Sequence, residues 1–93
     1  MKILLVQLDL QFYAAQSLKE KRSTLKRIVQ RLRSRLNVSV AEVDHHDEHD
    51  CGTIALVTVS MLEEATERTI ASCLREIELA GDVEIVAENR EWL

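Results

Sequence analysis

The chain has no proline and only two glycines among its 93 residues. Without proline- or glycine-rich stretches there is no candidate for a flexible linker between domains. Gly52 and Gly81 also lie too far apart to form a glycine-rich phosphate-binding loop. We therefore expect one domain spanning residues 1–93, which is long enough to bury a hydrophobic core.

Aromatic residues are equally scarce, since Phe12, Tyr13 and Trp92 are the only three. RNA-recognition motifs stack bases on aromatic side chains of their central strands. The strand predicted at Thr53–Val59 contains none. This class of RNA-binding domain is therefore not favoured.

Cysteine is limited to Cys51 and Cys73, and no signal peptide precedes the domain, so we expect a cytoplasmic protein. The first apolar run meets Gln7 and Asp9 too early to cross a membrane. Acids around Cys51 disfavour a thiolate, and Cys73 falls on a predicted core stripe. Cys51 lies near His49, but these acids make the pair an unconvincing nucleophile and base. We expect no enzyme activity, no cofactor and no membrane partner.

The segment Ser17–Leu36 is the most strongly patterned part of the chain. Ser17 and Glu20 have the spacing of a capping box, which begins a helix. Six apolar residues then recur at helical spacing and form one stripe for the core: Leu18, Leu25, Ile28, Val29, Leu32 and Leu36. The sequence therefore predicts a long amphipathic helix.

This predicted helix is strongly basic, whereas the chain as a whole carries a net charge of −4 and has a pI near 5.3. Its cations lie in two rows beside the apolar stripe, Arg27, Arg31 and Arg35 on one side and Arg22, Lys26 and Arg33 on the other. Like charges one turn apart repel, and Lys19, Lys21 and Arg22 also crowd the positive end of the helix dipole. Such a pattern favours either an anion-binding site or ion pairs with acids elsewhere in the chain, and the sequence leaves both open.

Four strands and a second helix complete the pattern. Alternation predicts strands at Ile3–Phe12, Asn37–Val43, Thr53–Val59 and Val83–Ala87. A second capping box at Ser60 and Glu63 predicts a helix that Gly81 ends. The order βαββαβ indicates an α+β, ferredoxin-like fold, in which a four-stranded antiparallel sheet carries both helices on one face. The opposite phases of Val40 and Val43 indicate either a bulge or two half-buried faces in the second strand.

The segment Asp44–Asp50, with sequence DHHDEHD, joins the second and third strands. His46 and His49, together with Asp47 or Asp50, are possible zinc or nickel ligands. A solvated hairpin tip does not hold such ligands rigidly, so a charged, exposed connection without metal is the favoured interpretation. The acids of this segment could also face the basic helix of a neighbouring subunit.

Three motifs carry a resemblance over essentially the whole chain. SLKEKRS, RLRSRLNVSVAEV and the closing REWL resemble the YlxP-like family of small bacterial proteins of unknown function. The resemblance implies a ferredoxin-like fold and gene neighbourhoods shared with a translation initiation factor and ribosome-binding factor A. No enzyme activity is implied. The chain departs from the family pattern at Glu48–Cys51, where the family commonly shows a hydrophobic or aromatic residue and a basic pair.

We therefore expect a non-enzymatic protein that contacts RNA phosphate through the basic helix, with ribosomal RNA or ribosome-assembly factors as partners. The expected anion-binding residues are Ser17, Lys19, Lys21, Arg22, Lys26, Arg27 and Arg31. The alternative is a protein–protein or homo-oligomeric module whose basic helix meets acidic surfaces, and the low pI favours it. Ile3 and Leu5 lie off the main core face of the first strand, so we also expect a homodimer.

Overall fold

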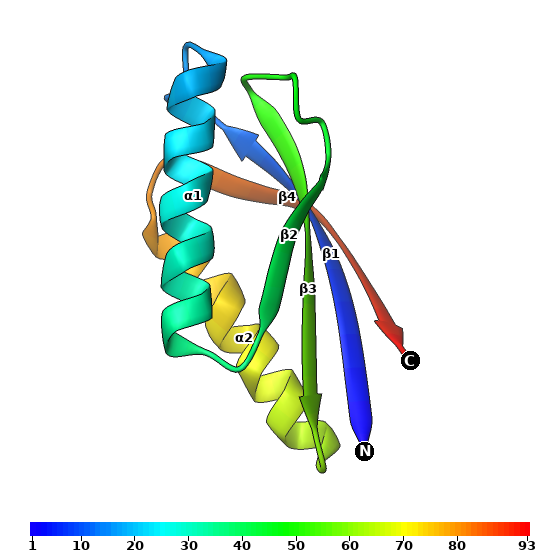
Figure 1. Cartoon of the computed structure of the whole chain (residues 1–93). Helices are drawn as coiled ribbons and strands as arrows, with labels where there is room; N and C mark the ends of the chain where they lie inside the picture. The colour runs from blue at the N-terminus through cyan, green and yellow to red at the C-terminus, as the bar shows by residue number, and fades with distance from the viewer.

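A computed structural model describes all 93 residues and contains four strands and two helices. The elements are β1 (Lys2–Phe12), α1 (Leu18–Arg35), β2 (Ser39–Asp44), β3 (Cys51–Ser60), α2 (Glu63–Leu79) and β4 (Val83–Trp92). The strands form one antiparallel sheet in the order β2-β3-β1-β4. Both helices cover the same face of this sheet (Figure 1). The ferredoxin-like prediction is confirmed.

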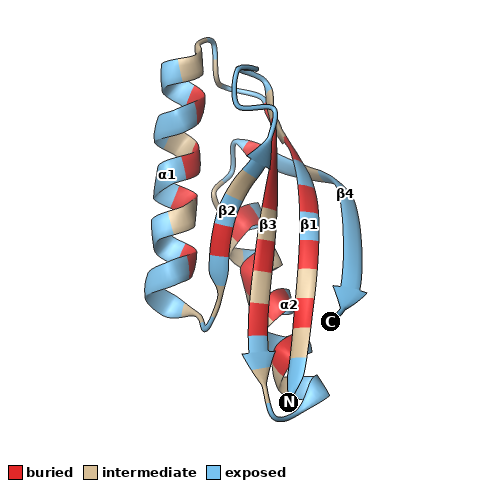
Figure 2. Ribbon diagram, turned by 45° about the vertical axis from the view of Figure 1, so that its right-hand side comes forward, coloured by how far each residue is buried: buried red, intermediate tan, exposed pale blue.

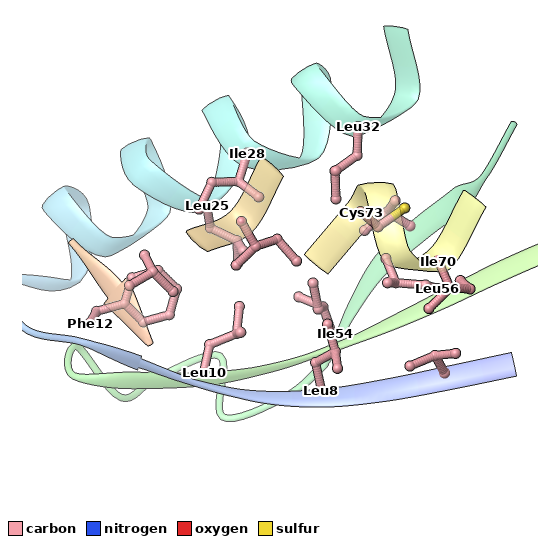
Figure 3. Packing of buried hydrophobic residues seen from close by; sticks show 14 of the residues in the cluster. Leu8, Leu10, Phe12, Leu25, Ile28, Leu32, Ile54, Leu56, Ile70 and Cys73 are labelled. Atoms are coloured by element: carbon pink, nitrogen blue, oxygen red, sulfur yellow. The ribbon is translucent and has the colours of Figure 1, made fainter. Parts of the chain in front are cut away.

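The core lies between the helices and the sheet, and strand alternation builds it. Even-numbered residues of β1 from Leu4 to Phe12 are buried, whereas Gln7 and Asp9 face away from the helices and are exposed (Figure 2). Leu25, Ile28 and Leu32 of α1, with residues of α2 such as Ile70 and Cys73, close over the sheet (Figure 3). Of the stripe predicted on α1, Leu25, Ile28 and Leu32 are buried, whereas the remaining three residues are only half-buried at the margin of the core: Leu18, Val29 and Leu36.

The helix ends agree only partly with the capping predictions. Ser17 is the N-cap of α1, and its Oγ accepts a hydrogen bond from the Glu20 amide at 3.1 Å. The Glu20 carboxylate accepts from the Gln16 amide instead of closing the box on Ser17. The second capping box is wrong, because Ser60 is still in β3 and α2 begins at Glu63.

Gly81 follows the end of α2 with φ of 85°, in the left-handed region that a glycine enters without a steric penalty, as predicted. The strand after it is longer than predicted. β4 continues through Trp92 and pairs with β1 as far as Leu4. No helix of the protein combines the length and apolar character that crossing a membrane requires.

Strand β2 contains a bulge, which is one of the two possibilities that the opposite phases of Val40 and Val43 indicated. The register with β3 shifts between Glu42 and Asp44, so Val43 is the extra residue and is exposed. The bulge lies at the outer edge of the sheet next to α1. It separates the buried Val40 from the hairpin that joins β2 to β3.

Candidate nucleic-acid interface on the first helix

Lys21, which its charge and position on α1 predicted to be an exposed anion-binding residue, is fully buried. It stands one turn before Leu25 and two turns before Ile28, on the face of α1 that packs against the sheet. Its Nζ donates to the carbonyl oxygens of His45 at 2.6 Å and Cys51 at 2.8 Å. The prediction that Lys21 binds an external anion is therefore wrong, because its ammonium is buried and hydrogen-bonded to groups of the same chain.

The Lys21 ammonium also forms an ion pair with Glu42 of β2. Oε2 of Glu42 lies 3.3 Å from Nζ, and the Glu42 side chain is mostly buried. Gly52 provides the space, since a Cβ there would lie 3.3 Å from this Oε2 and 3.4 Å from Cε2 of Phe12. One buried cation thus joins α1, β2 and the start of β3.

Three further predicted or neighbouring cations are engaged within the chain. Arg31 forms an ion pair of 2.8 Å with Glu76 of α2, and Arg35 lies 3.4 Å from the same carboxylate. Arg33 donates to the Val40 carbonyl of the edge strand β2. The second possibility that the sequence left open, pairing within the chain, is thus realised for part of the helix.

Ser17 also has a structural role, because its hydroxyl oxygen caps α1. The structure therefore removes three of the seven predicted anion-binding residues from the exposed cationic set, namely Ser17, Lys21 and Arg31. The signal for Lys21 was present in the sequence, since a lysine at the centre of an apolar stripe is a candidate for a buried ion pair.

Four of the predicted residues keep exposed cationic side chains without a carboxylate within ion-pair distance: Lys19, Arg22, Lys26 and Arg27. Arg22 and Lys26 line a shallow groove between α1 and the β2 edge, together with Arg33. Leu25 and Val29 also line it. We call this surface the cationic groove.

Electrostatics in the groove favour an anion. Glu42 is its one acidic lining residue, and that carboxylate already faces Lys21 and lies 2.8 Å from Nδ1 of His46. The cations along α1 are close enough to repel one another, and a bound phosphate relieves this repulsion. Lys19 and Arg27 are also exposed on this helix, but Arg27 belongs to the opposite row and lines a separate depression with Arg31 and Glu76.

The β2–β3 hairpin holds a second cluster of polar side chains. Nδ1 of His45 lies 2.9 Å from one oxygen of Glu48, and the Cys51 thiol donates to the other at 2.8 Å. The hydrogen bond to Glu48 raises the pKa of Cys51 to about 11. The expectation that nearby acids disfavour a Cys51 thiolate is confirmed.

The same hydrogen bonds change the other two groups. The thiol and the imidazole lower the pKa of Glu48, and the carboxylate raises the pKa of His45. The metal-ligand set considered from the sequence is not brought together, because His46 turns toward Glu42 and His49 is outside the cluster. Burial raises the pKa of Cys73 to about 11, which agrees with a packed, inert thiol.

Comparison with solved structures agrees with this architecture. SnoaB, a cofactor-independent oxygenase from Streptomyces nogalater, matches with a TM-score of 0.62 at 9% identity, covering 100% of this chain and 92% of that one. The structural-genomics protein YJCS matches with a TM-score of 0.60 at 11% identity, covering 96% of both chains. A designed protein with a ferredoxin fold, LFR1 1, gives 0.54 at 13% identity, covering 100% of this chain and 84% of its own. At such low identities these similarities show the fold alone.

Sequence comparison gives a closer relationship. The uncharacterized protein YlxP of Bacillus subtilis (strain 168) is 34% identical over 80 residues, which cover 86% of this chain and 87% of that protein. Residues 3–90 also match the model of the family described as protein of unknown function (DUF503). The chain therefore belongs to the DUF503 family, as its resemblance to the YlxP-like proteins indicated.

Proposed function

We propose that this protein is a non-enzymatic binding protein that holds RNA phosphate on the exposed side of α1. The observation that carries the proposal is the set of four unpaired cations on this side, Lys19, Arg22, Lys26 and Arg27, in a chain whose overall charge is negative. Buried or paired cations have a structural explanation. These four do not.

The groove has the features that a phosphate backbone requires. Arg22, Lys26 and Arg33 line one continuous depression, and an arginine fork contacts a phosphate through two donors. The acidic remainder of the chain repels nucleic acid and so orients it toward α1. Ribosomal RNA is the class of partner that the family's gene neighbourhoods imply, with a role in ribosome maturation.

The test is RNA affinity as a function of salt. If each of the four cations neutralises one phosphate, log K against log salt has a slope of about −2.8 to −3.6, from about 0.7–0.9 per contact. Fluorescence anisotropy with a labelled, unstructured single-stranded RNA measures it. Several RNA sequences bind alike, because phosphate contacts carry no base information.

A charge-reversal pair locates the site. Arg22→Glu with Lys26→Glu is expected to weaken binding at least about tenfold without loss of stability. Arg68→Glu with Arg75→Glu is the matched control, since both are exposed residues of α2 and the change of net charge is the same. Equal losses in the two variants, or no RNA binding at low salt, contradict the proposal. Binding of an acidic peptide in place of RNA identifies a protein partner instead.

A further inference from the structure

Outside α1, the β2–β3 hairpin brings together three side chains of different chemistry. His45 stands just after β2, Glu48 is in the connection, and Cys51 is the first residue of β3. Their ligand atoms, an imidazole nitrogen, a carboxylate oxygen and a sulfur, all lie within 4.8 Å of one another. None of the exposed cations of α1 forms an ion pair with these three side chains.

We infer that His45, Glu48 and Cys51 bind one Zn²⁺ ion and so close the hairpin. Nitrogen, sulfur and oxygen ligands are those that Zn²⁺ takes in proteins. Three protein ligands leave the fourth tetrahedral position for a water molecule. Magnesium and calcium are disfavoured, because both prefer oxygen ligands.

The present geometry is close to that of a metal site. Nδ1 of His45 lies 2.9 Å from Oε1 of Glu48, and Sγ of Cys51 lies 2.8 Å from Oε2. Tetrahedral bonds of about 2.0–2.3 Å separate neighbouring ligand atoms by about 3.3–3.5 Å. The His45–Glu48 and Glu48–Cys51 pairs therefore need to separate by less than about 1 Å. The ligand atoms of His45 and Cys51 already lie within 4.8 Å of each other, so side-chain rotation can bring all three around one ion.

The backbone of the site is held in place from beneath. Lys21 Nζ donates to the carbonyls of both His45 and Cys51, so one buried ammonium fixes the first and the third ligand residues. The Glu42 carboxylate 3.3 Å away offsets the Lys21 charge, which would otherwise repel a cation. This anchor distinguishes the cluster from a solvated loop.

Charge and protons balance in the binding step. Zn²⁺ displaces the proton of the Cys51 thiol, and the metal then bonds to the thiolate, the Glu48 carboxylate and the neutral His45 imidazole. The two anionic ligands neutralise the metal charge. The proton on Nδ1 of His45, which Glu48 now accepts as a hydrogen bond, also leaves that nitrogen. A neutral imidazole regains a proton at Nε2 from solvent, so the net release is the one thiol proton, whereas a protonated imidazole already has its Nε2 proton and releases a second one. The two hydrogen bonds of Glu48 are thereby exchanged for metal–ligand bonds.

Titration of the untagged, metal-free protein with Zn²⁺ and with Co²⁺ tests the inference. We expect one Zn²⁺ per chain with a dissociation constant below about 10 μM. Co²⁺ gives a thiolate charge-transfer band. Cys51→Ser abolishes this band, and His45→Ala and Glu48→Gln each weaken Zn²⁺ binding at least about tenfold. Zn²⁺ also raises the melting temperature of the wild type but not of Cys51→Ser.

Two matched variants act as controls. His49→Ala removes an imidazole of the same connection, and Cys73→Ala removes the buried thiol, and both retain Zn²⁺ affinity and the Co²⁺ band. Circular dichroism of every metal-free variant verifies folding. No binding at tenfold higher Zn²⁺, affinity unchanged in Cys51→Ser, or affinity lost in His49→Ala overturns the inference. The RNA measurements above use metal-free protein, so the two proposals fail independently.

Discussion

Lys21 Nζ lies 3.3 Å from Oε2 of Glu42, and this ion pair between α1 and β2 is closed from solvent on the lysine side. Burial of a charge is unfavourable unless partners replace the lost water. Lys21 has three, the carboxylate and two carbonyls of the hairpin. The first helix and the hairpin are therefore coupled through one side chain.

Lys21→Met is expected to destabilise the protein by about 3–5 kcal/mol, because it leaves Glu42 and two carbonyls without their cation. Urea unfolding followed by circular dichroism measures the loss. Lys19→Met is the control, since Lys19 is exposed on the same helix and its loss should cost less than about 0.5 kcal/mol. Equal effects of the two substitutions would contradict a buried ion pair.

The coupling between Lys21 and Glu42 has its own test. Glu42→Gln removes the charge of the carboxylate and keeps its shape. If the two side chains form the observed pair, the double variant loses less stability than the sum of the single ones, with a coupling energy of about 0.5–3 kcal/mol. Additive losses in the double-mutant cycle would assign the effect of Lys21 to its two carbonyl contacts alone.

Gly52→Ala tests the space beside this pair. The added Cβ would lie 3.3 Å from Glu42 Oε2, which is tighter than an ordinary van der Waals contact, and 3.4 Å from Phe12 Cε2, which is at the lower limit of one. The expected loss of unfolding free energy is about 1–3 kcal/mol, typical of overpacking. Ala55→Gly, in the same strand but on the helix-free face, serves as a comparison, since removing its half-buried methyl group is expected to cost about 0.5–1 kcal/mol through the greater backbone freedom of glycine. A Gly52→Ala protein as stable as the wild type would show that the ion pair can shift.

Much of the fold could be predicted from local pattern. Apolar and polar residues alternate along β1, and Leu25, Ile28 and Leu32 recur at helical spacing along α1. Each pattern arises because one face of the element is buried, with a period of 2 residues in a strand and 3.6 in a helix. The second half of β4 was not predicted, because it has no buried face to produce such a pattern. Residues Glu88–Trp92 lie at a sheet edge and are exposed, so no alternation marks them as a strand.

The candidate site was harder to predict. Whether a cation on α1 is free depends on what the neighbouring elements present, and Glu76 and Glu42 come from α2 and β2. The sequence shows which residues are charged but not which of them lie within ion-pair distance of one another. The hairpin cluster was not predicted, because the histidine that lies beside Glu48 and Cys51 is His45, whose φ is 63°, and not His46 or His49.

Leu32 tests the register of α1. Its side chain is fully buried between the helices and the sheet (Figure 3). Leu32→Ala is expected to reduce the unfolding free energy by about 2–5 kcal/mol through lost burial and the cavity left behind. Gln30→Ala, on the exposed side of the same helix, should change it by less than about 0.5 kcal/mol. A small loss at Leu32 would contradict the packing described above.

The helix-free face of the sheet leads to the last prediction, a homodimer. Ile3 pairs with Val59 and Leu5 with Val57 in the register of β1 and β3, so these four side chains form one apolar strip. No helix covers it, as Figure 2 shows, and Val59 is 44% exposed. A second copy with the same strip can bury it about a two-fold axis, since an isologous interface needs only one self-complementary surface.

Sedimentation equilibrium at micromolar concentration is expected to give the dimer mass for the wild type. Leu5→Glu places a charge in the centre of the strip and should give a monomer, because a desolvated carboxylate without a partner opposes association. Gln7→Glu adds the same charge at the next position on this face, where the register partner is Ala55 beyond the apolar strip, and should keep the dimer. A wild-type monomer at these concentrations, or a Leu5→Glu dimer, would exclude this face as the interface. RNA affinity measured on the same variants separates association from the cationic groove, which lies on the opposite side of the sheet beside α1.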